Sequence, residues 1–219
     1  MDSGKKKRNH TKARVYKNER LGQITRTAAS LFYKQGYLQT STRQIAEACG
    51  ISKGNLYHYI KSKDDFLDLF VEMTTSSFDE LSNRIRRQLL KTSPASSLTE
   101  AIKESLKLAD VLQDMILFWY HESKNHDSIR LRKLMKQDLH TVDLFKTIIE
   151  AGCQQGDFKV SDPMLAAFNI MMLCDMWSLK RWYIRKHYTL ETYTAKCQEI
   201  ALAIALGSQR SIPTSTKSR

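Results

Sequence analysis

The residues best suited to chemistry lie in one short stretch, CGISKGNLYHYIKSKDDFL, at positions 49–67. Leu56 and Ile60 are four residues apart, so a helix would place both on one apolar face. The opposite face would carry small, long or flat polar groups, which are Ser52, Lys53, Gly54, Asn55, Tyr57 and His58. Such groups suit contacts with phosphates and base edges better than bond-breaking chemistry. The stretch therefore predicts a recognition surface.

Basic residues are concentrated in the same part of the chain. Residues 1–63 contain 14 Lys and Arg against three acidic residues, a net charge of +11. Residues 64–219 contain 21 against 20, a net charge of +1. Solubility alone does not require so uneven a distribution. A basic module attached to a near-neutral body indicates a polyanionic partner for the module.

The elements that must position this surface are helices. Only eight glycines and three prolines occur in 219 residues, and no useful strand alternation is present. The spacing of apolar residues, caps and glycines predicts an all-α fold with helices at about 19–35, 42–49, 53–59, 63–90, 98–124, 128–155, 163–185 and 190–206. Residues 1–16 are expected to form a disordered basic arm and residues 208–219 a disordered tail.

Several classes of protein are disfavoured. The chain has no nucleophile elbow, P-loop or Rossmann glycine pattern, so we expect no catalytic residues and no cofactor. HESKNH at residues 121–126 departs from H-E-x-x-H, so we expect no metal site. The four widely spaced cysteines include no C-x-x-C pair, and no run of about 18 apolar residues occurs. We therefore expect a soluble, cytoplasmic protein that does not enter a membrane.

Three short helices with a glycine between the second and third form the frame of a helix-turn-helix unit. In such a unit the third helix enters the major groove, and its apolar residues hold it from behind. Here Leu56 and Ile60 would supply that anchor. Thr42 and Arg43 at the start of the second helix can donate to phosphate, and Lys61 and Lys63 follow the third.

Residues 28–70, AASLFYKQGYLQTSTRQIAEACGISKGNLYHYIKSKDDFLDLF, resemble the DNA-binding domain of TetR (tetracycline-repressor-type) transcriptional regulators. The positions on the family pattern are Ala28, Leu31, Phe32, Gly36, Tyr37, Thr40 to Thr42, Ile45, Ala46, Gly50, Leu56, Tyr57, Lys61 and Lys63. The family commonly has histidine and phenylalanine where this chain has Tyr59 and Ile60. That departure leaves the division of contacts between His58 and Tyr59 open.

The resemblance implies a ligand-responsive regulator, most simply a repressor, that binds a palindromic double-stranded DNA operator. It implies DNA contacts by Thr42, Arg43, Lys53, Asn55, Tyr57, Tyr59 and Lys63. It also implies a DNA-binding domain at 17–77, followed by a helical ligand-binding and dimerisation domain at 78–207. The last two long helices of such regulators usually form a homodimer, and a small-molecule effector binds the body.

Two aromatic-rich stretches of the body are candidates for the effector site. They contain Phe118, Trp119, Met176, Trp177, Lys180, Arg181 and Arg185. Cationic groups beside an apolar cavity fit an acidic amphipathic ligand such as an acyl-CoA or a fatty acid. The second stretch also resembles the corresponding region of family members that sense acyl-CoA.

Alternatives remain open from the sequence. The same aromatic residues fit ordinary core or dimer-interface packing. A regulator of this fold could instead sense a hydrophobic drug-like compound and control efflux. A basic protein that binds nucleic acid without sequence preference is a further alternative, although it leaves the neutral helical body unexplained.

Overall fold

The computed structural model describes residues 3–122 and 128–207, and every regular element in these ranges is a helix. The helices are α1 (Ser3–Gln35), α2 (Thr42–Ala48), α3 (Lys53–Leu56), α4 (Asp65–Leu89), α5 (Pro94–Glu122), α6 (Ser128–Gln155), α7 (Pro163–Leu179), α8 (Arg181–His187) and α9 (Leu190–Leu206). The all-α prediction is confirmed. None of these helices combines the length and the apolar composition needed to cross a bilayer.

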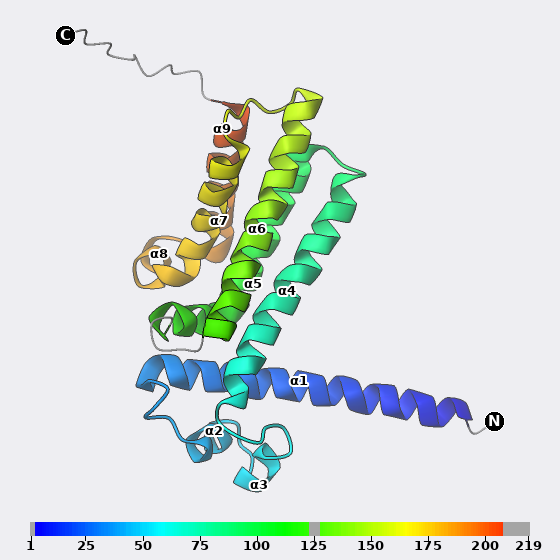
Figure 1. Cartoon of the computed structure of the whole chain (residues 1–219), viewed down its shortest axis with the longest axis vertical. Coiled ribbons are helices and arrows are strands. Elements are labelled where there is room, and N and C mark those ends of the chain that lie inside the picture. The colour runs from blue at the N-terminus through cyan, green and yellow to red at the C-terminus, as the bar shows by residue number, and fades with distance from the viewer. Residues whose placement is uncertain (1–2, 123–127, 208–219) are drawn as a thin grey trace.

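The helices form a small head and a larger body (Figure 1). α1 lies across the base of the body, and α2 and α3 lie below it. α4 starts beside α3 and rises into the body, where it packs against α5 and α6. α5 also packs against α7 and α9. α4 and α5 therefore connect the head to the rest of the molecule.

The head core is built from aromatic and aliphatic side chains of several helices. Phe32 of α1 and Phe70 of α4 are buried, and their rings lie 5.7 Å apart between centroids. Phe118 of α5 enters the same core, with its ring 5.7 Å from that of Phe32 and 5.6 Å from that of Phe70. Aromatic pairs at this spacing contribute packing beyond the area they bury. A body helix thus completes the core of the head.

The first predicted boundary is corrected by the structure. α1 begins at Ser3, so the arm expected to be disordered at 1–16 is helical from residue 3 onward. Residues 5–21 contain no proline or glycine, and their lysines, arginines and alanine favour a helix. Their small number of apolar residues suggested disorder, but continuity with the packed part of α1 extends the helix. The tail predicted at 208–219 lies outside the described residues.

Three other helix boundaries also differ. α3 ends at Leu56, and the amides of His58 and Tyr59 bond three residues back in tight turns instead of continuing the helix. α5 begins at Pro94, four residues before the predicted start, because the Ser93 hydroxyl accepts the amide of Ser96. The helix predicted at 163–185 is broken at Lys180 (φ −115°, ψ 28°) into α7 and α8.

Candidate nucleic-acid interface and effector sites

Local hydrogen bonds fix the positions of α2 and α3. The Ser41 hydroxyl accepts the amide of Gln44, and the Gln44 side chain accepts the amide of Ser41, which makes a capping box. Gly50 turns the chain with φ +64°, a conformation that other residues rarely adopt. Ser52 then caps α3 by accepting the amide of Asn55. The predicted cap roles at the start of both helices are confirmed.

The anchor predicted for the recognition helix is present. Leu56 and Ile60 are buried, and they pack in the head core with Ile45 and Ala46 of α2. Because these four side chains face inward, the opposite surface of α3 faces solvent. The exposed candidates on this surface and beside it are Arg43, Ser52, Lys53, Gly54, Asn55, Tyr57, His58 and Lys61.

Tyr57 lies at the centre of the exposed surface. It is 44% exposed although it is large and aromatic. Its hydroxyl lies 3.4 Å from the Thr42 hydroxyl, which joins the end of α3 to the start of α2. The Lys53 ammonium lies 5.8 Å from the centroid of the Tyr57 ring. The arrangement brings a hydroxyl pair and a cation together on one face, and such groups can donate to phosphate and base edges.

Two predicted contact residues have structural partners instead of full exposure. The Lys63 ammonium donates to the carbonyls of Tyr37 (2.8 Å) and Thr40 (3.1 Å), and it lies over the Tyr37 ring at 4.2 Å. It therefore ties the loop after α1 to the start of α4. Tyr59 is partly buried and packs against the head core. Arg43 is exposed, although its guanidinium is paired with Glu47 at 2.8 Å.

The predicted effector residues separate into two groups. Phe118 and Trp119 are buried in the head core. Met176 packs against the body core, and Trp177 is buried within it. The exposed Lys180 lies at the break between α7 and α8. Neither of the two cavities described below is lined by members of this predicted set.

Two of the three cationic members of the set, Arg181 and Arg185, pair with carboxylates of α5. Arg185 pairs with Asp110 at 2.5 Å and lies over the Trp177 ring, and the Trp177 indole also donates to Asp110 at 2.8 Å. Arg181 pairs with Asp114 at 2.8 Å and lies over the ring of Tyr33 in α1. These contacts fasten α8 to α5 and α1. The sequence did not reveal the partners because they are more than 60 residues away.

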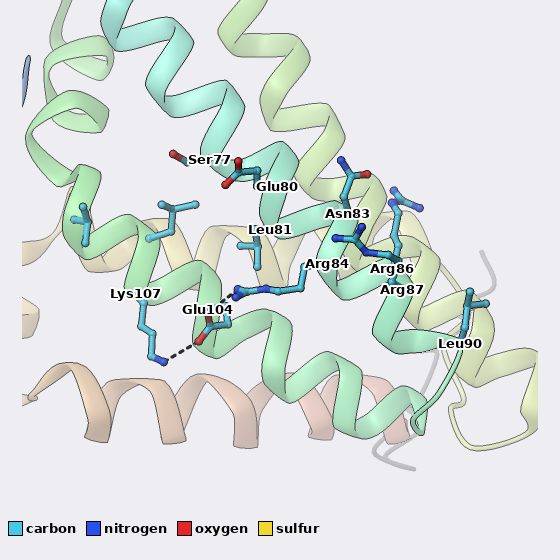
Figure 2. A pocket seen from close by; sticks show the side chains of 12 residues that line it. Ser77, Glu80, Leu81, Asn83, Arg84, Arg86, Arg87, Leu90, Glu104 and Lys107 are labelled. Carbon is cyan, nitrogen blue, oxygen red and sulfur yellow. Dashed lines mark hydrogen bonds and ion pairs between the residues drawn. The ribbon is translucent and has the colours of Figure 1, made fainter. Parts of the chain in front are cut away.

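A groove that sequence reasoning missed lies between α4 and α5. Its volume is about 940 Å³, and Figure 2 shows its lining residues, which are Ser77, Glu80, Leu81, Asn83, Arg84, Arg86, Arg87, Leu90, Glu104, Lys107, Leu108 and Val111. Hydrogen bonds from Lys107 and Arg84 lower the pKa of Glu104. Arg86 pairs with Asp143 of α6, whereas Arg87 has no ion-pair partner among the described residues. The signal available in the sequence was the cluster RIRR at 84–87.

Known protein families match both the head and the body of the chain. The family model "Bacterial regulatory proteins, tetR family" matches residues 24–69. The model "Tetracyclin repressor-like, C-terminal domain" matches residues 91–202, which is half of the chain. The chain belongs to the TetR family of transcriptional regulators. It is a ligand-responsive regulator and not an enzyme.

Individual TetR-family proteins match over most of their lengths. The regulator HbdR of Aromatoleum sp. (strain CIB) is 27% identical over 176 residues, which are 80% of this chain and 76% of HbdR. The repressor KstR2 of Rhodococcus jostii (strain RHA1) is 28% identical over 170 residues, 76% of this chain and 81% of KstR2. AibR, solved in complex with isovaleryl coenzyme A and operator DNA, superposes with a TM-score of 0.64 at 21% identity, over 85% of this chain and 98% of AibR. The similarity to AibR shows that the two proteins share a fold.

One apolar surface of this TetR-family chain is left uncovered. α7 exposes Met164, Leu165 and Phe168 at 51%, 56% and 47%. α9 exposes Ile200 at 44% and Leu206 at 57%. α7 and α9 are in contact with each other, and exposed apolar patches on neighbouring elements are typical of protein-association surfaces.

Proposed function

We propose that the chain represses transcription as a homodimer on a palindromic operator and leaves the DNA when a small molecule binds. The observation that carries this proposal is the exposed polar face around Tyr57, held from behind by the buried Leu56 and Ile60. Thr42, Lys53 and Asn55 would share the groove with Tyr57, and Arg43 and Lys61 would lie at the flanking phosphates. Its site of action would be the chromosome in the cytoplasm.

Dimerisation through α7 and α9 is supported by their exposed apolar residues. α7 is apolar around most of its circumference, which is typical of a helix covered on all sides. A partner copy would cover Met164, Leu165 and Phe168. Two heads related by a two-fold axis would read half-sites separated by about 34–36 Å or a multiple of it.

A gel-shift assay tests the DNA-binding proposal. The double variant Lys53→Ala, Tyr57→Ala should lose most of its affinity for the region upstream of its own gene, at physiological salt. Arg132→Ala, which changes an exposed basic residue of the body outside the groove, is the matched control and should bind as the wild type does. A discrete palindromic footprint for the wild type would support operator recognition. Unchanged affinity of the double variant would contradict it.

An acyl-CoA is the effector class we favour. AibR supports this choice, since it was solved with isovaleryl coenzyme A. The groove between α4 and α5 adds a physical reason. Its basic residues Arg84, Arg86, Arg87 and Lys107 outnumber Glu80 and Glu104, and Arg87 has no ion-pair partner among the described residues. The volume of the groove suits a ligand of nucleotide size.

Calorimetric titration with acyl-CoAs of increasing chain length tests the effector class. We expect binding that releases the operator, with an affinity that Arg87→Ala weakens. Arg132→Ala on α6, outside the groove, provides the control. No heat and no release from DNA across the series would remove acyl-CoA as the effector.

A further inference from the structure

A second, smaller cavity lies among α4, α5, α6 and α7. Its volume is about 50 Å³. Phe78, Ile116, Leu134 and Met171 supply apolar walls. Six polar side chains line the same space, and they are Thr74, Tyr120, Gln137, Asp138, Thr141 and Asp175. Thr74, Gln137 and Thr141 are buried, and buried polar groups destabilise the fold unless they are hydrogen-bonded.

Two of the polar groups lack a partner. Thr74 is 7% exposed and Gln137 is 4% exposed, yet neither the Thr74 hydroxyl nor the Gln137 side-chain nitrogen is hydrogen-bonded within the described part of the chain. Thr75, the neighbour of Thr74, donates its hydroxyl to the carbonyl of Val71. The Thr74 hydroxyl makes no such bond to a backbone carbonyl. Both unpartnered groups therefore remain available to something inside the cavity.

The two carboxyl groups of the cavity differ in exposure, since Asp138 is exposed and Asp175 is partly buried. Neither has an ion-pair partner among the residues that the structure describes. Burial raises the pKa of Asp175 to about 7, and the nearby charge of Asp138 adds to the shift. Burial also raises the pKa of Asp138, to about 6. The two carboxylates can accept hydrogen bonds, and a donor placed between them would stabilise their ionised forms.

We propose that this cavity recognises a hydroxyl group carried by the apolar part of the effector. A hydroxyl can donate to a carboxylate of Asp138 or Asp175 and accept from Gln137 or Thr74 at the same time. An ammonium group donates only, so it would leave the Gln137 nitrogen unsatisfied. A plain alkyl group would leave the Thr74 hydroxyl and the Gln137 nitrogen unsatisfied. The inference rests on the proposed release by a small molecule, and it narrows the acyl-CoA class to hydroxylated acyl groups.

The test compares 3-hydroxyoctanoyl-CoA with octanoyl-CoA by calorimetry. We expect the wild type to bind the hydroxylated compound at least about tenfold more tightly. Gln137→Leu and Asp175→Asn should each remove most of this preference. Asp79→Asn, an exposed carboxyl of α4 outside the cavity, should retain it. Gln137→Leu replaces an unpartnered polar group with an apolar one of similar size, so we expect this variant to fold.

The outcomes separate this inference from the effector class. Equal binding of the two compounds by the wild type, or a preference that both cavity variants retain, would overturn the hydroxyl site and leave an acyl-CoA effector standing. If neither compound binds, the acyl-CoA class fails and the cavity is tested with benzyl alcohol, benzylammonium and toluene. Selective shifts of the Ile116 and Met171 methyl resonances by benzyl alcohol would support the site. Shifts by benzylammonium or toluene instead, or no shifts, would overturn it.

Discussion

The head and α8 both carry cationic side chains beside aromatic rings, but the two regions use them differently. In the head, Lys53 lies over the exposed Tyr57, and no acidic residue of the described chain pairs with it. On α8, Arg181 and Arg185 also lie over rings, yet each is paired with an aspartate of α5. A cation already paired inside the fold contributes to structure, whereas an exposed unpaired cation can bind an anion from solution. Whether a cation is ion-paired inside the fold therefore distinguishes a structural role from anion binding better than its residue type does.

Removing the α8 arginines should give the largest effect on stability. Arg181→Ala, Arg185→Ala would leave Asp110 and Asp114 without their cations and remove two cation–ring contacts. We expect a loss of about 2–3 kcal/mol in the free energy of unfolding, measured by urea denaturation, because the pairs are only partly exposed. Operator affinity of the folded fraction should change little. If this variant kept its stability but bound the operator more weakly, the assignment of a structural role to the α8 arginines would be wrong.

A change at the centre of the exposed head surface should weaken operator binding and leave stability nearly unchanged. Tyr57→Ala is expected to weaken operator binding by about 1–3 kcal/mol in a titration at fixed salt. The melting temperature should stay near that of the wild type, because the side chain is exposed and packs only at its edge. Tyr59→Ala, which truncates a partly buried neighbour, is the informative comparison, since we expect it to lower stability as well.

The unpaired carboxyl of Asp175 extends the comparison to negative charge. Its pKa is raised from 3.8 to about 7, so the folded state holds the proton more tightly than the unfolded state. The contribution of protonated Asp175 to the free energy of unfolding is fully present below about pH 4, and it is lost as the pH rises to about 7. Asp175→Asn should therefore be more stable than the wild type at pH 8, by roughly 1–2 kcal/mol after allowance for solvent access, with a smaller gain at pH 5. A gain independent of pH would exclude ionisation as the cause.

The smallest effect is expected at the margin of the head. Arg43→Ala should weaken operator binding only a few-fold, because its guanidinium is exposed and shared with Glu47. The slope of log affinity against log salt should fall by about one for one lost phosphate contact. Lys34→Ala, at an exposed site near the end of α1, serves as a control whose slope is expected to stay unchanged.

The sequence predicted the head better than the effector site for a physical reason. The roles of Ser41, Ser52, Leu56 and Ile60 depend on neighbours within four residues, and local spacing encodes such contacts. Arg185 and Asp110 are 75 residues apart, so spacing could not show that the charge predicted to bind a ligand is already paired. The cavity polar groups were missed for the same reason, because Thr74, Gln137 and Asp175 come from three different helices.

The length of α1 was predicted incorrectly because composition was given more weight than continuity. Residues 5–17 have no apolar face of their own, and a segment of that kind is unstable as an isolated helix. Joined to the packed turns around Ile24 and Phe32, it continues an existing helix without the cost of nucleation. The break at Lys180 was missed because the residues around it include no proline or glycine.

The position of Phe118 has a consequence for how the molecule unfolds. Its ring packs against both Phe32 and Phe70, so the core of the head is incomplete without α5. The boundary drawn at residue 77 therefore separates two functions but not two independently folding units. Head and body should melt together in a single cooperative transition, and a fragment ending at residue 77 should lack a stable fold.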